Sequence, residues 1–293
     1  MADRRPPLLI AIAAALRLLS RIWPRAASRV AIDLFRTPRR FRTPQRERAL
    51  LADAEPFQVA AGVDTLIQAW SWGSGPLVIL AHGWEGRGSQ MAAFARPLVD
   101  AGFRVVTFDA PGHGASTGRQ SSLPHFAWAL REVAGATARP YAIIAHSLGC
   151  AAATLAMRDG LAVDRVVFLS PPLSPEDYTR QFGEMLGLSD AVIAGLRARI
   201  EERFLRKWED YSLAKSAPLM TAPLLVIHDR EDDETPWSGG AALAELWPDA
   251  RLMTMVGLGH RRVLREQATI EAATQFLLPT AATIFPTASS SVP

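Results

Sequence analysis

Cysteine is almost absent from this chain of 293 residues, in which Cys150 is the single one. One thiol excludes an internal disulfide framework and any zinc site built from four cysteines, so we expect the fold to depend on its hydrophobic core. Lysine is nearly as scarce, with two residues among the 32 basic ones. A chain of this length, 49% hydrophobic, can bury about three quarters of its unfolded surface, which suits one large α/β domain or two small ones.

Long hydrophobic runs are missing as well. The apolar run at 8–16 has nine residues before Arg17 interrupts it, whereas a bilayer-spanning helix takes about 20. No small-x-small cleavage site follows cleanly and arginines come at once, which is a poor fit to a signal peptide. We therefore expect a cytoplasmic location, and the low cysteine count is compatible with that reducing compartment.

Acidic residues are rare in the first 48 positions, which carry twelve arginines against three carboxylates for a net charge of +9. The remaining residues carry a net charge of −6, so the formal charge of +3 hides an asymmetry. We assign residues 1–56 to a basic helical N-terminal arm. Sign asymmetry of this kind indicates contact between the arm and a membrane surface or a polyanion.

The arginines of the arm are regularly spaced. Four of them recur at every fourth position and share one helical face: Arg17, Arg21, Arg25 and Arg29. Pro24 is expected to kink or restart that helix. One interpretation is a basic amphipathic helix that contacts anionic lipid, at the inner face of the membrane, or a partner through residues 8–48. The other, which we favour, is an extension that packs its apolar face on the body and solvates its arginines.

From about residue 57 the apolar pattern alternates between strand-like and helix-like periods. Strands are predicted near 57–60, 64–72, 76–82, 103–109, 141–146, 165–170, 223–228 and 251–256. Helices are predicted near 89–101, 123–138, 148–159, 237–247 and 261–277. This order predicts an α/β fold with a mostly parallel eight-stranded sheet and helices on both faces, over residues 57–278. Continuous apolar runs at 77–80 and 224–227 indicate central strands.

One connection is far longer than usual. About fifty residues separate the strands that end near Ser170 and begin near Leu224, and 185–208 has helical spacing. We expect a small helical cap insertion at about 171–218, overhanging the ligand crevice at the carboxyl end of a strand. Four of its side chains are candidates for an acyl pocket or, equally, for the core of the insertion: Phe182, Met185, Trp208 and Tyr211. The tail at 279–293 is Thr/Ala/Ser/Pro-rich and is expected to be disordered.

The candidate nucleophile is Ser147, at the junction of a buried strand and an Ala-rich helix. Such a junction can raise a serine on a sharp, strained turn, with the N-terminus of the following helix pointing at it. Strand and helix pass closely there, so small residues are needed two positions before and after the serine, and Ala145 and Gly149 meet that need. The pattern Ala-x-Ser-x-Gly is weak by itself and needs context.

A second buried strand, ending at His82, supplies context because a glycine turn follows it. Acyl transfer needs two preorganised N–H donors for the oxyanion, one after the nucleophile and one from this other turn. The candidates are the N–H groups of Leu148 and Trp84. His82 itself is either a catalytic base or, as we favour from its place before glycine, a support for the turn.

A serine nucleophile also needs a general base with an orienting carboxylate. Two histidines follow Ser147, and His260 is the candidate base because it stands in a loop after glycines, whereas His228 ends an apolar strand. The carboxylate should come from the acidic run at 229–234, most of which is explained as a solvated turn. Asp232 is favoured there, and Asp229 and Asp233 are the alternatives.

Together these segments resemble the α/β-hydrolase family over roughly residues 70–278. The resemblance rests on His-Gly-Trp at 82–84, Asp-Ala-Pro-Gly-His-Gly-Ala-Ser at 109–116, Ala-His-Ser-Leu-Gly at 145–149, the acidic segment at 227–236 and Gly-His at 259–260. The family order of serine, aspartate and histidine implies Ser147, Asp232 and His260. The chain departs from the family pattern at three positions. Ala145 replaces the first glycine of the turn around the nucleophile, Trp84 stands at the oxyanion position, and Glu85 follows it. The carboxylate of Glu85 is expected to disfavour anionic substrates.

The resemblance implies a serine hydrolase that cleaves a carboxylic ester or thioester through an acyl-enzyme, with a small-molecule substrate and no cofactor. Serine at the elbow sets the chain apart from dehalogenases and epoxide hydrolases of this fold, which carry aspartate there. Carboxylesterase, thioesterase, lipase, perhydrolase-like and carbon–carbon hydrolase activities all share the triad, and the fold does not choose among them. The chain length of the acyl group, the leaving group and the oligomeric state stay open.

No phosphate-binding glycine loop, metal-ligand cluster or nucleic-acid motif stands out in the sequence of the body. We therefore expect no metal and no nucleic-acid partner. Cys150, near the start of the helix after the nucleophile, is interpreted as a small core residue more readily than as a reactive thiol. The alternative from another functional class is a non-catalytic protein of the same fold that acts as a membrane- or partner-binding module.

Overall fold

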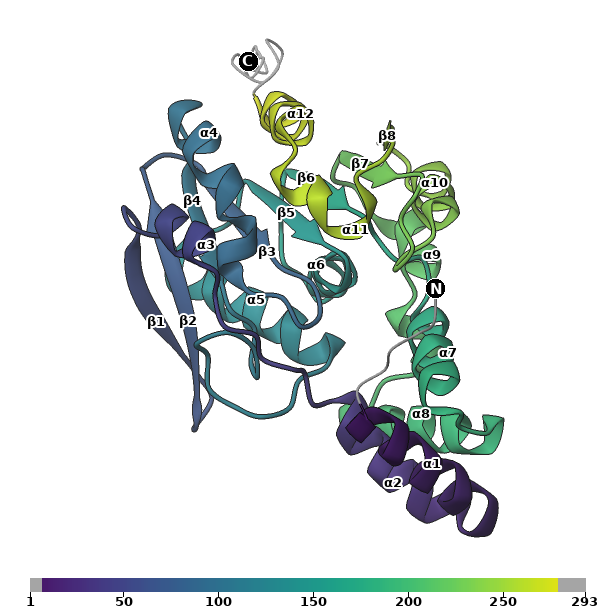
Figure 1. The fold of residues 1–293 in the computed structure, drawn as a ribbon. Coiled ribbons are helices and arrows are strands. Elements are labelled where there is room, and N and C mark those ends of the chain that lie inside the picture. Colours follow the sequence, from purple (N-terminus) through teal and green to yellow (C-terminus); the bar gives the residue numbers. More distant parts are fainter. Residues whose placement is uncertain (1–6, 279–293) are drawn as a thin grey trace, which may run out of the picture.

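A computed structural model describes residues 7–278, with side chains from residue 11, so the prediction for residues 279–293 lies outside the described residues. Within residues 7–278 the strands form one eight-stranded sheet in the order β1-β2-β4-β3-β5-β6-β7-β8 (Figure 1). The strands are β1 (Glu55–Ala61), β2 (Thr65–Trp72), β3 (Leu77–Ala81), β4 (Arg104–Phe108), β5 (Ala142–His146), β6 (Arg165–Leu169), β7 (Leu224–Asp229) and β8 (Ala250–Met255). β2 runs antiparallel to β1 and β4, and the other neighbours are parallel. The predicted α/β fold is confirmed.

Helices lie between these strands. The α-helices are α1 (Pro7–Ile22), α2 (Pro24–Phe35), α3 (Gln45–Leu50), α4 (Ala95–Asp100), α5 (Leu123–Thr137), α6 (Leu148–Arg158), α7 (Pro175–Leu186), α8 (Asp190–Phe204), α9 (Leu213–Ser216), α10 (Trp237–Leu246), α11 (Gly259–Arg262) and α12 (Gln267–Leu277). Short 3-10 helices are η1 (Gly88–Phe94), η2 (Trp208–Tyr211), η3 (Ala217–Leu219) and η4 (Val263–Arg265). The helix predicted at 261–277 is interrupted, because Glu266 has an extended backbone between η4 and α12.

The central strands are apolar because helices cover both faces of the sheet. In β3, Leu77, Ile79 and Ala81 belong to the core shared with α5 and α6. The alternate residues Val78 and Leu80 belong to the core shared with η1, α4 and α12. Successive side chains of a strand point to opposite faces, so a strand buried on both faces reads as a continuous apolar run. Because β3 to β8 run parallel to one another, the carboxyl ends of these strands lie at one edge of the sheet.

The predicted cap insertion forms α7, α8, η2, α9 and η3, which lie between β6 and β7. Helix α7 starts sharply because the Ser174 hydroxyl accepts a hydrogen bond from the N–H of Glu176 and Pro175 stands at the first helical position. It ends at Gly187, which has a left-handed conformation. Since the insertion leaves the sheet at the carboxyl end of β6, it overhangs the edge where the strand ends gather.

The N-terminal helices pack on this insertion. Helices α1 and α2 lie side by side, α2 contacts α8, and α1 contacts α7 (Figure 1). The buried face of α2 includes Ala27, Ala31 and Ile32, and Phe35 meets Phe182 of α7 edge to face with ring centroids 5.1 Å apart. The chain restarts its helix at Pro24, as predicted. The apolar face of the arm therefore packs on the insertion, as in the second interpretation of the arm given above.

The segment after α2 then crosses the body and is tied to it by charged side chains. Arg40 donates to the carbonyl oxygens of Gly112, Ser116 and Gly118 at 2.7 to 2.9 Å. From α3, the buried carboxylate of Glu47 accepts hydrogen bonds from Arg87 at 2.7 and 2.8 Å and from the Ser89 hydroxyl at 2.8 Å. Because both members of this ion pair are buried, neither charge is compensated by solvent.

Glu47→Ala is expected to lower the free energy of unfolding by about 3 kcal/mol or more, because it leaves the buried guanidinium of Arg87 unpaired. The control, Asp164→Ala, breaks a pair with Arg139 whose side chains are 58% and 44% exposed, and should cost about 1 kcal/mol or less. Urea unfolding followed by circular dichroism measures both. Equal losses in the two variants would contradict the burial argument.

Candidate active site

Ser147 stands alone in the turn that joins β5 to α6. Its backbone has φ 52° and ψ −122°, a strained conformation for a residue with a side chain. The turn is this sharp because α6 starts directly against the end of β3. A side chain at Gly149 would put its Cβ 2.6 Å from the carbonyl oxygen of His82, so the position admits only glycine without a shift of the backbone. The predicted strand-turn-helix geometry around Ser147 is present.

The glycine turn after β3 lies against this serine. A Cβ atom built on Gly83 would lie 2.9 Å from Cβ of Ser147. Within residues 7–278, no acceptor takes a hydrogen bond from the N–H of Trp84 or of Leu148. Leu148 is the first residue of α6, where the helix dipole adds partial positive charge. Leu148 follows Ser147 directly, and Trp84 follows the glycine that contacts it. Among the described residues, neither N–H group has an acceptor, so both are free to bind an oxyanion.

His82 supports the glycine turn from beneath. Its Nδ1 lies 2.6 Å from the carbonyl oxygen of Gly83, and its Nε2 accepts a hydrogen bond from the N–H of Ala110 at 2.9 Å. Burial lowers the pKa of His82 well below its ordinary value, so the ring is neutral, with Nδ1–H as the donor. This geometry matches the supporting role rather than that of a catalytic base.

His260 and Asp232 are hydrogen-bonded to each other. His260 Nδ1 lies 2.8 Å from Asp232 Oδ2, and the other oxygen, Oδ1, accepts from the N–H groups of Glu234 and Thr235 at 3.0 and 2.8 Å. Burial by itself raises the pKa of Asp232, but the hydrogen bonds from His228 and His260 outweigh it and hold that pKa well below its usual range. The carboxylate is therefore ionised at neutral pH and accepts the Nδ1–H of His260.

The two alternative carboxylates do not meet His260. Asp229 accepts hydrogen bonds from the N–H groups of Glu231 and Leu258 at 2.8 and 2.9 Å, and so shapes the two loops. Asp233 is exposed, as expected for a solvated turn. Within the acidic run, the structure brings only Asp232 to the imidazole. His260 itself starts the short helix α11 rather than standing in a free loop.

Two further histidines hold the base and the acid, and the sequence analysis gave neither of them this role. His146 Nε2 lies 2.9 Å from the carbonyl oxygen of His260, and burial lowers the pKa of His146 to about 3, so the neutral ring donates. His228 Nε2 lies 3.3 Å from Asp232 Oδ2 and 3.0 Å from the carbonyl oxygen of Thr235. The signals available in the sequence were their places at the carboxyl ends of β5 and β7.

The hydroxyl of Ser147 is paired with the cap insertion. Its Oγ lies 3.4 Å from the hydroxyl of Tyr178 on α7. Among the hydrogen bonds of the described residues, none joins Ser147 Oγ to His260. The imidazole of His260 contacts the ring of His146, the residue before the nucleophile, with ring centroids 4.6 Å apart. Hydrogen bonds between nucleophile and base are often long without substrate and tighten when it binds.

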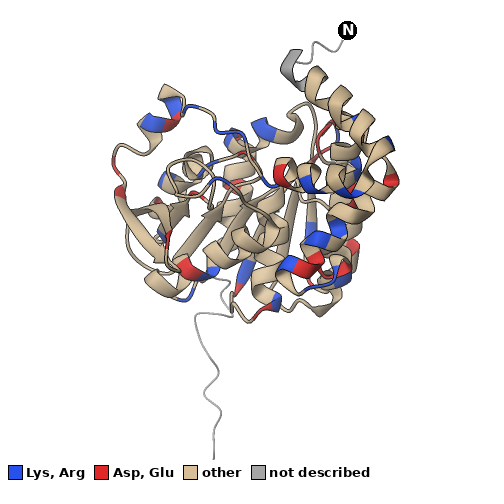
Figure 2. Cartoon of the chain, turned by 90° about the horizontal axis from the view of Figure 1, so that it is seen from below, with Lys and Arg blue, Asp and Glu red and all other residues tan. Residues whose placement is uncertain are grey.

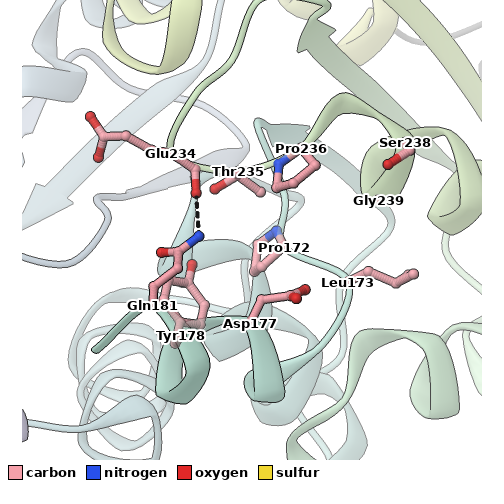
Figure 3. Close-up of a pocket in the computed structure, with 10 residues that line it drawn as sticks. All are labelled: Pro172, Leu173, Asp177, Tyr178, Gln181, Glu234, Thr235, Pro236, Ser238 and Gly239. Carbon is pink, nitrogen blue, oxygen red and sulfur yellow. Dashed lines mark hydrogen bonds between the residues drawn. The ribbon is translucent and has the colours of Figure 1, made fainter. Parts of the chain in front are cut away.

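A pocket of about 200 Å³ opens beside Tyr178, between α7 and the acid loop, which we define as residues 230–236 (Figure 3). It is lined by Pro172, Leu173, Asp177, Tyr178, Gln181, Glu234, Thr235, Pro236, Ser238 and Gly239. The side-chain amide of Gln181 donates to the carbonyl oxygen of Glu234 at 3.0 Å and bridges the two walls. The insertion and the acid loop thus form the walls of one pocket, and Tyr178, which lines it, also contacts Ser147 Oγ.

The four side chains proposed for an acyl pocket do not line this one. Phe182 packs against Phe35 of the arm, and Trp208 meets Tyr211 with ring centroids 5.9 Å apart. Tyr178 takes the position next to the serine instead. Helical spacing predicted the insertion but carries no information on which helix face meets Ser147, so Tyr178 was missed.

Two other sequence hypotheses can be set against the structure. The carboxylate of Glu85, beside the oxyanion turn, is bound by the guanidinium of Arg39 at 2.8 to 3.0 Å, so its charge is paired from the N-terminal segment. The Cys150 thiol is buried, and burial raises its pKa well above the ordinary value, which agrees with a core residue. Among residues 7–278, no group of three or more His, Cys, Asp or Glu side chains is arranged to hold a metal ion.

Comparisons with known proteins identify the family and the fold. A family model described as "Alpha/beta hydrolase family" matches residues 78–273. A relative from Xanthomonas axonopodis pv. citri, named pimeloyl-[acyl-carrier protein] methyl ester esterase, is 28% identical over 246 residues, which is 69% of this chain and 95% of the relative. Helices long and apolar enough to cross a membrane were not found in the described part of the chain.

Solved structures share the fold. An esterase from Pyrococcus furiosus has a TM-score of 0.64 at 17% identity and covers 82% of this chain and 98% of its own. A bacterial membrane phospholipase A has a TM-score of 0.61 at 19% identity and covers 92% of this chain and 95% of its own. The second likeness is wide enough to take in part of the N-terminal helices.

Stability should fall in mild acid because several buried histidines are neutral. Burial lowers the pKa of His113 and His125 to about 4 and that of His146 to about 3, against about 6.5 in the unfolded chain. The unfolded state therefore binds protons first. The free energy of unfolding should be constant between about pH 7 and 8 and fall between about pH 6.5 and 4, by up to about 1.4 kcal/mol per pH unit for each histidine.

Urea unfolding at a series of pH values measures this dependence. His125→Gln removes one such group and should reduce the slope below pH 6.5, while leaving the stability between about pH 7 and 8 independent of pH. A urea midpoint that stays unchanged between pH 7 and pH 5 would contradict the neutral, buried state of these rings.

Proposed function

The chain belongs to the alpha/beta hydrolase family, and from that premise we propose that Ser147, His260 and Asp232 form the catalytic triad of a serine hydrolase. The observation that carries the proposal is the His260–Asp232 hydrogen bond next to a serine held at positive φ. The curated relatives are named as esterases, which supports a carboxylesterase-type activity. The chain is therefore a hydrolase of carboxylic esters.

In the proposed reaction, Ser147 Oγ attacks the carbonyl carbon and its proton passes to Nε2 of His260. The electron pair of the carbonyl π bond moves to oxygen, where the N–H groups of Leu148 and Trp84 stabilise the charge. When the intermediate collapses, the alkoxide leaves and takes the proton from His260, which forms the acyl-enzyme. A water molecule then attacks the acyl carbon while His260 takes its proton, and the second intermediate collapses to release the acid and return the proton to Ser147 Oγ. Asp232 stays ionised throughout and stabilises the imidazolium.

The proposed substrate is a small uncharged carboxylic ester. Methyl ester cleavage is what the names of the relatives state, and that supports an ester over a thioester. Arg39 pairs with the carboxylate of Glu85, so that side chain is no strong obstacle to a polar acyl chain. The reaction as written needs no metal and no redox cofactor, because all its proton and electron-pair transfers use the triad and water.

The triad can be tested without knowledge of the substrate. A fluorophosphonate probe should label the wild-type protein once per chain, and Ser147→Ala and His260→Ala should abolish the label, since triad members act as a unit. Asp232→Asn should slow labelling by a factor of about 10³ to 10⁴ because it disturbs the tautomer of the base. Intact-protein mass spectrometry measures all four.

Asp233→Asn is the matched control, because that carboxylate is exposed and away from the imidazole. It should label like the wild type. Labelling that persists in Ser147→Ala would rule out Ser147 as the nucleophile, and labelling lost equally in both aspartate variants would contradict the assignment of the acid.

We further propose a peripheral membrane contact through the N-terminal arm, at the inner face of an anionic membrane. The observation that favours it is an exposed apolar tip at the turn between α1 and α2. Leu18, Ile22 and Trp23 are 61%, 72% and 65% exposed there. The tip is flanked by exposed Arg21 and Arg25, and the basic residues can be followed in Figure 2.

This chemistry suits a lipid interface. An aromatic ring and aliphatic groups enter the boundary between head groups and acyl chains, while arginines bind anionic head groups. The likeness to a membrane phospholipase A that covers 92% of this chain supports the proposal. The contact would add to catalysis by the triad, so the arm is an accessory of an enzyme and the non-catalytic alternative is not favoured.

Flotation with phosphatidylglycerol vesicles tests the arm. Ile22→Ser together with Trp23→Ser should remove most of the lipid-bound fraction, because burial of those side chains supplies the apolar part of the affinity. The control Val63→Ser changes an apolar residue that is 99% exposed in the β1–β2 turn and should float like the wild type. Equal flotation of all three proteins, or equal binding to neutral phosphatidylcholine vesicles, would contradict the proposal.

A further inference from the structure

We propose that the pocket beside Tyr178 takes the alcohol part of the ester, a short uncharged alkyl group, and that the Tyr178 hydroxyl donates a hydrogen bond to the leaving oxygen. This inference rests on the proposed function and deepens it. Three observations carry it: where the hydroxyl lies, which side chain and loop the pocket adjoins, and how large the pocket is.

Tyr178 reaches the reacting centre from the cap insertion. Its hydroxyl lies 3.4 Å from Ser147 Oγ, and no other side chain of the described residues makes a hydrogen bond to that oxygen. Burial raises the pKa of Tyr178, so the group stays protonated and can donate over the whole working range of a serine hydrolase. An ester bound to Oγ places its own oxygens within reach of this donor.

The pocket adjoins the acid loop, and Tyr178 links it to the reacting centre, because this residue lines the pocket and its hydroxyl lies 3.4 Å from Ser147 Oγ. The N–H groups of Glu234 and Thr235 bind Asp232, and the same two residues line the pocket with Tyr178. Asp232 in turn holds His260, the residue that gives its proton to the departing oxygen. The oxyanion donors come instead from the end of β3 and the start of α6, so the carbonyl oxygen and the alkoxy oxygen have different neighbours.

The volume and the lining of the pocket limit the size and the polarity of the alcohol. At about 200 Å³ the pocket is smaller than the roughly 300 to 1,000 Å³ that drug-sized ligands need. Pro172, Leu173 and Pro236 give it apolar walls. These apolar walls favour an uncharged alcohol, and the carboxylates of Asp177 and Glu234 at the same pocket are paired with Arg180 and Arg261. A short, uncharged alkyl alcohol fits both limits.

The contribution of Tyr178 depends on the charge that develops. As the bond between the acyl carbon and the alkoxy oxygen breaks, its electron pair stays on that oxygen, which takes the proton from His260 Nε2. The Tyr178 O–H donates a hydrogen bond in this step and keeps its own proton. Its effect should therefore grow with the negative charge on the leaving oxygen.

The test compares Tyr178→Phe with the wild type on two esters of nearly equal size, ethyl butanoate and 2,2,2-trifluoroethyl butanoate. The fluorines withdraw charge from the leaving oxygen, so that ester needs the donor less. For ethyl butanoate kcat/KM should fall by about 10 to 100-fold. For the trifluoroethyl ester it should fall by about threefold or less. This parameter covers the steps up to release of the alcohol, so slow deacylation does not hide the effect.

Tyr211→Phe is the matched control. Tyr211 belongs to the same insertion, is buried, and its hydroxyl has no hydrogen-bond partner among the described residues. This variant should hydrolyse both esters like the wild type. A Tyr178→Phe protein that equals the wild type on both esters, or that loses the same factor on both, would overturn the role of the hydroxyl.

The size of the pocket is tested with butanoate esters from methyl to octyl. Wild-type kcat/KM should decline steeply once the alcohol exceeds a few carbons, and Leu173→Ala should restore the longer esters relative to methyl by about tenfold. An octyl ester cleaved as well as methyl by the wild type would overturn the pocket assignment. A wild-type protein that neither reacts with a fluorophosphonate nor cleaves any ester would overturn the proposed function and this inference together.

Discussion

The close approach of α6 to the end of β3 is the constraint on which the rest of the site depends. Gly149 has no space for a side chain against the carbonyl oxygen of His82, and Ser147 is forced to a positive φ in front of it. The strain raises the hydroxyl above the strand ends. The same approach brings the glycine turn of β3 to the serine, so one packing contact places both the nucleophile and the second oxyanion donor.

Histidines support the loops around that contact. His82 fixes the turn after β3, His146 fixes the backbone of His260, and His228 binds the carboxylate of Asp232. The neutral ring of His82 donates with Nδ1 and accepts with Nε2, so it joins two loops without a charge. His228 and His260 share the ionised carboxylate of Asp232, and for His260 this partner stabilises the imidazolium that catalysis requires.

The N-terminal segment connects surfaces that are far apart in the sequence. Its helices pack on the cap insertion, and Arg39 and Arg40 then bind Glu85 and the loop after β4. A membrane contact at the α1–α2 tip would therefore be tied, through continuous packing, to the insertion that carries Tyr178. The basic arm thus contacts the insertion that carries Tyr178 and also presents an exposed surface.

Much of the fold and of the candidate site could be predicted from the sequence, because local sequence patterns determine those parts. The eight strands follow from alternating apolar periods. Asp232 was favoured over Asp229 and Asp233 in the acidic run after a strand, and His260 was chosen because it follows glycines, in the order that the family resemblance implies. Tyr178 could not be found in that way, since its position next to Ser147 depends on how an irregular insertion settles on the sheet. The supporting roles of His146 and His228 likewise depend on contacts across 114 and 4 to 7 positions that no periodicity reveals.

Acylation of Ser147 is the step that defines the proposed mechanism, and it can be observed by trapping the acyl-enzyme. Wild-type protein would be mixed with a short-chain ester, quenched in acid within milliseconds to seconds, digested and analysed by mass spectrometry. The account predicts that the peptide containing Ser147 gains the mass of the acyl group and that the increment maps to the serine. An acyl group on another residue, or rapid turnover with that peptide unmodified at every time point, would contradict it.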